Sequence, residues 1–175
     1  GRFEVTDTVA LNGSGAEEVL SIAGAVEQQS NHPLALAVVR AAQEKVYRAF
    51  LEPDALAKWI PPNGFTCTVH HQEPVVGGTF KSSFRNFTNG QSHSFGGRYL
   101  ELVPGERLRY TDCFDDPQLP GEIVVTVSMK AVPCGTELTI LQENLPDAIP
   151  AAQCYLGWQE SLRNLARLVE PDIRG

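Results

Sequence analysis

The chain has 175 residues, of which 42% are hydrophobic and 20% are charged. This composition is typical of a folded globular protein and excludes an extensively disordered or low-complexity chain. Its 14 Lys and Arg against 21 Asp and Glu give a net charge of -7, and the pI is near 5.1. This acidic balance argues against a nucleic acid or an anionic membrane surface as a partner. The length predicts one main domain with a short additional segment.

No apolar run approaches the roughly 18 to 20 residues that a membrane helix needs, and no basic region followed by an apolar run opens the chain. We therefore expect a cytoplasmic protein without membrane insertion. The cysteines form no C-x-x-C pair, so we interpret them as reduced thiols and expect neither a metal site nor a cofactor. They are Cys67, Cys113, Cys134 and Cys154.

The composition changes near residues 33–44. Residues 1–44 contain 2 basic and 6 acidic side chains and a single aromatic residue, Phe3, whereas nearly all aromatics and prolines follow later. In this first part the pattern predicts a strand over residues 3–9 and an amphipathic helix over residues 17–29. Pro33 and the residues just before it end that helix.

From Lys45 onward the pattern predicts two short helices, near residues 45–50 and 54–60. Runs with alternating apolar and polar residues follow, each bounded by Gly, Pro, Asn or Asp. They span residues 65–72, 79–86, 93–103, 106–114, 122–131 and 136–143. Short links between successive strands predict an antiparallel meander.

The last predicted element is a long amphipathic helix over residues 151–169 with a wide apolar stripe. The stripe consists of Tyr155, Trp158, Leu162, Leu165, Ala166 and Val169. This helix can bury its stripe only against the sheet, so we expect an α+β domain with one curved sheet packed on one helix. Such an arrangement leaves a cavity, for which we expect at least the roughly 300 Å³ of small-molecule sites.

Six short segments of the chain form a recognisable series: EKVYRAF at 44–50, DALAKW at 54–59, GGTF at 77–80, FGGRY at 95–99, ERLRYT at 106–111 and GWQESL at 157–162. In this order they resemble the START-like (SRPBCC) proteins of the heat-shock protein 90 ATPase activator homologue type. The resemblance covers about residues 38–173. It implies the helix-grip fold, in which the sheet wraps around the C-terminal helix.

Eight aromatic residues are candidates for the wall of a ligand cavity in this fold. For any one of them we favour a place in the core, because aromatic side chains bury large areas wherever they lie, whereas as a set they indicate an apolar cavity. They are Trp59, Phe65, Phe84, Phe95, Tyr110, Phe114, Tyr155 and Trp158.

General acid–base catalysis needs a titratable group within reach of the substrate. The candidates are His70, His71, His93, Tyr110, Asp112 and Glu143. None of them lies in a motif of defined chemistry, and the sequence contains no nucleophile elbow or phosphate loop. We therefore assign no catalytic residue.

The first 37 residues resemble the start of the nucleotide-binding domain of heavy-metal P-type ATPases, through GRFEV at 1–5, EEVL at 17–20 and the segment from Glu27 to Ala35. The resemblance implies that Glu27 and His32 would contact the adenine of ATP. The phosphorylated aspartate motif, the glycine loop and every membrane helix of that family are missing, which excludes transport. We therefore predict a fusion, with a truncated ATPase-like fragment at 1–37 and a START-like domain at 38–175.

The joint at residues 34–41 is compatible with a helix or a strand, because short apolar runs do not separate the two by periodicity. We favour a strand, since Val38 and Val39 are β-branched and the sheet needs its edge filled. Otherwise residues 3–9 could occupy that edge.

Four functions remain open from the sequence. The leading one is a non-enzymatic START-like domain that binds a small apolar ligand between the sheet and the C-terminal helix. The alternatives are a protein-interaction module acting on a chaperone or another protein, an enzyme of the cyclase or dehydratase kind, and an ATP-binding remnant.

Overall fold

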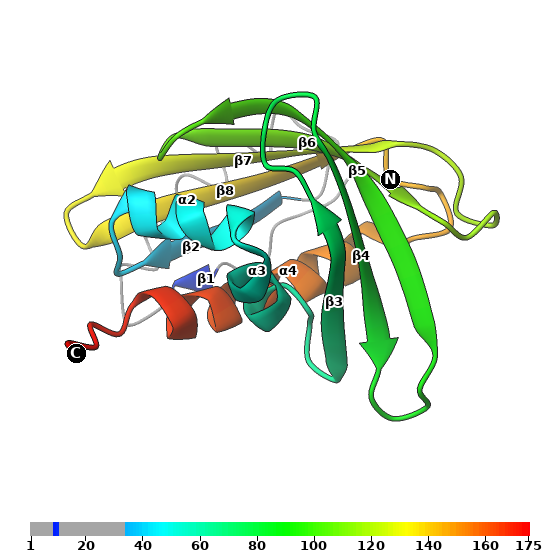
Figure 1. Cartoon of the computed structure of the whole chain (residues 1–175), viewed down its shortest axis with the longest axis horizontal. Coiled ribbons are helices and arrows are strands. Elements are labelled where there is room, and N and C mark those ends of the chain that lie inside the picture. Colours follow the sequence, from blue (N-terminus) through cyan, green and yellow to red (C-terminus); the bar gives the residue numbers. More distant parts are fainter. Residues whose placement is uncertain (1–8, 11–33) are drawn as a thin grey trace.

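The computed structural model describes residues 9–10 and 34–175. An eight-stranded sheet in the order β1-β2-β8-β7-β6-β5-β4-β3 dominates the described structure, with the described helices on its concave side (Figure 1). The strands are β1 (Val9–Ala10), β2 (Leu34–Val39), β3 (Phe65–Gln72), β4 (Thr79–Asn86), β5 (Ser92–Val103), β6 (Arg107–Phe114), β7 (Ile123–Val132) and β8 (Gly135–Glu143). The helices are α2 (Gln43–Leu51), α3 (Pro53–Trp59) and α4 (Ala151–Val169).

The strands β3 to β8 form the predicted meander, each antiparallel to the next along the chain. β3 and β4 begin and end at the predicted residues; β5, β6 and β8 differ by one residue at their first position, and β7 differs by one residue at both ends. The α+β helix-grip fold is therefore confirmed. Alternating apolar and polar positions determined these strands because one face of the curled sheet is buried.

The segment 34–39 is a strand, as favoured from the sequence. Over its whole length, from Leu34 to Val39, β2 pairs antiparallel with β8, and the short β1 lies parallel to it on the other side. The predicted boundary between residues 37 and 38 falls inside β2 and stays a prediction. Glu27, His32, the helix predicted at 17–29 and all but Val9 of the strand predicted at 3–9 lie outside the described residues.

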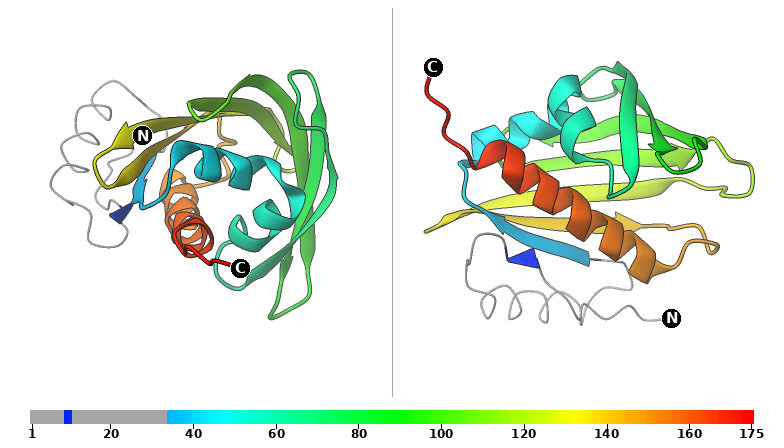
Figure 2. Two further views of the ribbon diagram at one scale, coloured as in Figure 1. Left: turned by 60° about the vertical axis from the view of Figure 1, so that its left-hand side comes forward. Right: turned by 90° about the horizontal axis from the view of Figure 1, so that it is seen from below.

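The sheet curls around α4, so that this helix lies in the concave face together with α2 and α3 (Figure 2). α4 follows Pro150 and ends just before Pro171, which suits the missing N–H of proline. Most of the predicted stripe is buried, and Trp158, which is only half-buried, is its exception. The buried members are Tyr155, Leu162, Leu165, Ala166 and Val169.

Hydrogen bonds attach the link between α3 and β3 to α4. The Ser161 hydroxyl donates to the Ile60 carbonyl at 2.6 Å, and Asn164 Nδ2 donates to the Pro61 carbonyl at 3.2 Å. The Glu160 carboxylate accepts from the Asn63 N–H at 3.0 Å. One face of α4 thus fixes the position of the segment that closes one side of the concave face.

The turn between β7 and β8 requires glycine at residue 135. Gly135 has a φ of 146°, and a Cβ there would lie 2.0 Å from the carbonyl oxygen of Val39. The turn at Pro133-Cys134-Gly135 therefore coincides with a close approach of β2 to β8.

None of the described helices is long and apolar enough to cross a membrane.

The packing of α4 predicts that two leucines of this helix contribute very differently to the free energy of unfolding. Leu162 is fully buried and Leu156 is 56% exposed. Leu162→Ala should lower the free energy of unfolding by about 2–5 kcal/mol, because the helix cannot fill the void. Leu156→Ala should change it by less than about 0.5 kcal/mol. Urea unfolding of both variants measures this, and equal losses would contradict the packing described.

Candidate functional site

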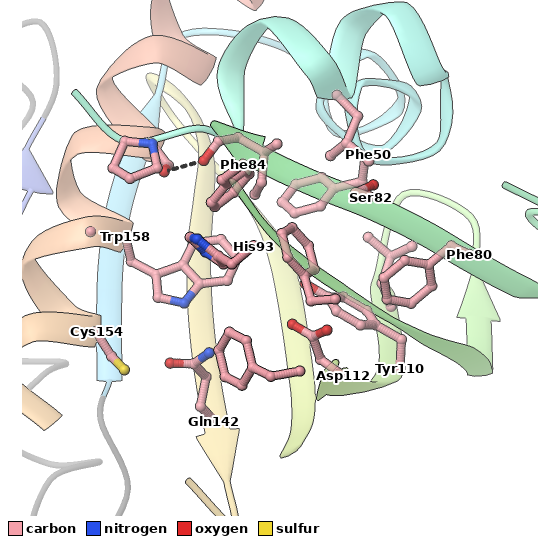
Figure 3. Close-up of a pocket in the computed structure, with 18 of the residues that line it drawn as sticks. Phe50, Phe80, Ser82, Phe84, His93, Tyr110, Asp112, Gln142, Cys154 and Trp158 are labelled. Atoms are coloured by element: carbon pink, nitrogen blue, oxygen red, sulfur yellow. Dashed lines mark hydrogen bonds between the residues drawn. The ribbon is translucent and has the colours of Figure 1, made fainter. Parts of the chain in front are cut away.

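A pocket lies between the N-terminal half of α4 and the concave face of β4, β5 and β6. The ends of α2 and α3 close one side, and β8 contributes one residue (Figure 3). The lining residues are Phe50, Leu51, Leu56, Ile60, Pro62, Phe80, Ser82, Phe84, His93, Phe95, Tyr99, Leu108, Tyr110, Asp112, Phe114, Gln142, Cys154, Gly157, Trp158 and Ser161.

The pocket volume is about 210 Å³, smaller than the roughly 300 Å³ expected from the sequence. The expectation was wrong because inward-facing aromatic rings occupy much of the space. The rings of Phe84 and Phe95 meet edge to face with centroids 4.8 Å apart, and those of Phe80 and Tyr110 do so at 5.6 Å. The remaining room suits a molecule smaller than a typical drug.

The structure places five of the eight aromatic candidates on the pocket wall, namely Phe84, Phe95, Tyr110, Phe114 and Trp158. Trp59 and Tyr155 are buried in the core instead, where the Trp59 indole N–H donates to the Ala49 carbonyl at 2.8 Å. Phe65 lines a separate surface depression beside Asn164 and Arg167.

Asp112 is the one carboxyl group among the described residues that line the pocket. It lies on β6 between Tyr110 and Phe114, which also face inward, and Figure 3 shows its carboxyl group directed into the pocket. Its Oδ1 atom is buried and has no hydrogen-bond partner in the described part of the chain. Burial raises the pKa of Asp112 to about 7, although the Cys113 N–H and the more distant Lys81 act in the opposite direction.

Gln142 presents a second polar group to the pocket, from β8. Its Oε1 atom is likewise buried without a hydrogen-bond partner among residues 9–10 and 34–175. A buried polar atom without a partner is costly, and native proteins rarely contain one without a reason. Asp112 and Gln142 thus give the apolar pocket two unused acceptors.

His93 lies among aromatic rings on the pocket wall. Its ring lies 5.7 Å from that of Phe84 and 6.3 Å from those of Phe95 and Phe114, measured between centroids. This burial lowers the pKa of His93, so the imidazole is neutral at pH 7. His93 can exchange hydrogen bonds with a ligand but supplies no positive charge.

Two more titratable groups on the wall are neutral at ordinary pH. Burial raises the pKa of the Tyr110 phenol well above its usual value, with a further contribution from nearby Asp112. Burial also raises the pKa of the Cys154 thiol, and an inert thiol of this kind is not an activated nucleophile.

The remaining acid–base candidates lie away from the pocket. His70 shares a hydrogen bond with the Ser83 hydroxyl at 2.8 Å, and His71 contacts Glu73 at 3.0 Å. Glu143 ends β8 and is not part of the wall.

Sequence reasoning missed several wall residues that the period-two alternation could have identified. Phe80 and Ser82 share their strand face with the predicted Phe84, and Gln142 shares its face with buried Leu138 and Ile140. Tyr99 likewise shares its strand face with the predicted Phe95, since the irregularity of β5 comes after Tyr99. Phe50 had no such signal, because it lies near the end of a helix.

The family model for activator of Hsp90 ATPase homolog 1-like proteins matches residues 40–170. The chain belongs to this AHSA1-like family. The resemblance to START-like proteins of this type is thereby confirmed, and it covers the sheet from β3 to β8 and all three helices. The resemblance of residues 1–37 to a P-type ATPase lies outside the matched range and stays a prediction.

Solved structures show the same fold. A crystal structure of a protein from Chromobacterium violaceum is 57% identical, covers 81% of this chain and 98% of its own, and superposes with a TM-score of 0.79. An AHSA1-like protein from Aeromonas hydrophila, solved by NMR, is 25% identical over 79% of this chain and 92% of its own, with a TM-score of 0.65. No significant match is found among curated proteins.

Within the part of the chain that the structure describes, no group of three or more His, Cys, Asp or Glu side chains could hold a metal ion.

The buried carboxyl group predicts a pH dependence of stability. The pKa of Asp112 is about 7 in the folded protein against 3.8 for an ordinary Asp, so the folded state binds the extra proton between these values. Stability from this group should therefore fall as the pH rises from about 4 to about 7, by up to about 1.4 kcal/mol per pH unit.

Urea unfolding gives the free energy of unfolding of the wild type and of Asp112→Asn at each pH. The difference between the two isolates the contribution of Asp112, since the other groups titrate alike in both proteins. The free energy of unfolding of the variant, relative to that of the wild type, should increase with rising pH and become constant above about pH 7. Asp116→Asn, at an exposed loop residue, should show no such trend. A flat difference for Asp112→Asn above about pH 5 would contradict the buried carboxyl.

Proposed function

We propose that this AHSA1-like domain binds a small, largely apolar ligand in the pocket between the concave face of the sheet and α4. The supporting observation is the pocket itself, in which aromatic and aliphatic side chains surround a few convergent polar groups. This combination is usual for small-molecule sites, where apolar walls provide affinity and polar groups fix orientation.

The volume limits the size of the ligand. An engineered apolar cavity of about 150 Å³ accommodates benzene, and the pocket here has about 210 Å³. A molecule with one ring and a short substituent therefore matches the available space.

An enzyme of the cyclase or dehydratase kind is the second candidate, and Asp112 is the observation that favours it. A general acid or base works best with a pKa near the operating pH, and the pKa of Asp112 is raised to about 7. A bound compound recovered chemically changed would support this candidate, whereas a compound recovered intact supports binding alone.

The exposed apolar side chains give less support to a protein-interaction module. Val75 and Val76 lie in the β3–β4 link, whereas Phe87 lies in the β4–β5 link. These links are at opposite ends of β4, and the other large exposed apolar side chains of the described residues, Leu100, Leu156 and Ile173, lie on β5, on α4 and after α4. The exposed apolar side chains are thus spread over several elements, whereas interaction sites are marked by one large patch.

Gly157 offers a direct test of binding. It lies in the middle of α4 on the pocket wall, and a Cβ added there would meet nothing within 4 Å. Gly157→Leu and Gly157→Phe should fill the pocket and abolish binding of ethylbenzene, while Gly157→Ala should retain it. All three changes remove a glycine from the interior of a helix, and this removal by itself should stabilise the protein by about 0.5–1 kcal/mol.

Thermal unfolding with and without ethylbenzene is the measurement. At about ten times the Kd, the wild type and Gly157→Ala should gain about 1.4 kcal/mol, a rise in Tm of roughly 3–6 °C. The two filled variants should remain folded and show no gain. Equal gains in all four proteins would place the binding elsewhere and contradict the proposal.

A further inference from the structure

We propose that the ligand is a small amine, with an apolar body among the aromatic rings and an ammonium group bound between Asp112 and Gln142. This inference rests on the proposed binding function and specifies the chemistry of the ligand's polar end. The observation behind it is that the two buried side-chain oxygens without partners on the pocket wall are both acceptors.

The sheet directs both side chains into the same space. Tyr110 on β6, Val125 on β7 and Gln142 on β8 are aligned across three neighbouring strands. Asp112 lies two residues beyond Tyr110 on the same face, since successive side chains alternate between faces. Figure 3 shows Asp112 and Gln142 extending from their two strands toward the pocket.

The described residues of the wall offer no cationic partner for an anionic ligand. No Lys or Arg occurs among the described residues that line the pocket, and His93 is neutral because burial lowers its pKa. Lys81, the cation that acts on Asp112, forms an ion pair with Asp115. A ligand carboxylate would therefore meet the Asp112 carboxyl without compensation, and such repulsion costs affinity.

An ammonium group fits the vacant acceptors better than a neutral hydroxyl group. It has three N–H donors and can serve both oxygens while Asp112 is ionised, whereas a hydroxyl has one donor and can serve both oxygens only while Asp112 is protonated. Its charge stabilises the ionised form of Asp112, which burial disfavours. The surrounding aromatic faces also attract cations, as in the aromatic cages that bind organic ammonium ligands.

The groups that face this position are few, and they define the expected pH behaviour. They are His93 and Tyr99 from β5, Tyr110 from β6 and Cys154 from α4, with Lys81 on β4 acting from outside the pocket. The raised pKa values of Tyr99, Tyr110 and Cys154 leave Asp112 as the group on the wall that gains charge near neutral pH.

Four probes with the same phenyl-ethyl body but different ends separate the possibilities: ethylbenzene, phenethyl alcohol, phenethylamine and hydrocinnamate. Binding to the full chain is followed by the fluorescence of Trp158, which lines the pocket, and by calorimetry. Phenethylamine should bind about tenfold or more tightly than the alcohol, as expected for a charge-assisted hydrogen bond. Hydrocinnamate should bind more weakly than ethylbenzene.

Asp112→Asn should abolish the preference for the amine but retain binding of ethylbenzene and the alcohol, because the side chain keeps its shape. The exposed Asp116→Asn, which removes the same charge outside the pocket, should retain the preference. In the wild type, amine affinity should rise about tenfold from pH 6 to pH 8 as Asp112 ionises, while alcohol affinity should show no such rise. This pH series tests the inference even if Asp112→Asn does not fold.

The outcomes separate this inference from the proposed function. Binding of ethylbenzene and the alcohol without preference for the amine, or an amine preference that persists in Asp112→Asn, overturns the inference and leaves the binding function intact. Hydrocinnamate binding as tightly as the amine also overturns the inference. Absence of binding by all four probes overturns the proposed function as well.

Discussion

The structure depends on the packing of α4 inside the curled sheet. The sheet curls so widely that the side chains of α4 do not fill the space beneath it along the whole length of the helix. Toward its C-terminal end α4 inserts Leu162, Leu165 and Val169 into the core, where all three are buried. Toward its N-terminal end Gly157 has no Cβ, and the wall opposite consists of β4 to β6. The core is therefore continuous at one end of α4, and the pocket occupies the other.

This geometry accounts for the polar groups that the domain tolerates inside. A carboxyl group and an amide oxygen without partners would be unfavourable in a closed core, because their desolvation is not compensated. At Asp112 and Gln142 they face a space that a ligand or water can enter. The two oxygens without partners thus lower stability at the position of the candidate ligand site. Proteins commonly depart from optimal packing at functional sites.

The fold was largely predictable from the sequence because each element has a local signal. The alternation in β3 to β8 and the 3.6-residue stripe of α4 arise from burial of one face, and turn glycines such as Gly135 separate the strands. The site was less predictable. The pocket residues Phe84, Phe95 and Tyr110 are aromatic and were expected to face inward. The same holds for Trp59 and Tyr155, which are buried in the core instead.

From residue 43 onward the sequence by itself determined the order, type and approximate limits of the elements, and it indicated the AHSA1-like family; for residues 34–39 it only favoured a strand. Only the tertiary structure decided which inward side chains fill the core and which border a pocket. The reason is that periodicity fixes the face of a side chain, whereas the distance to the opposite layer depends on how the sheet curls around α4. The short additional segment suggested by the length supplies β1 and part of β2, and β2 fills the sheet edge beside β8.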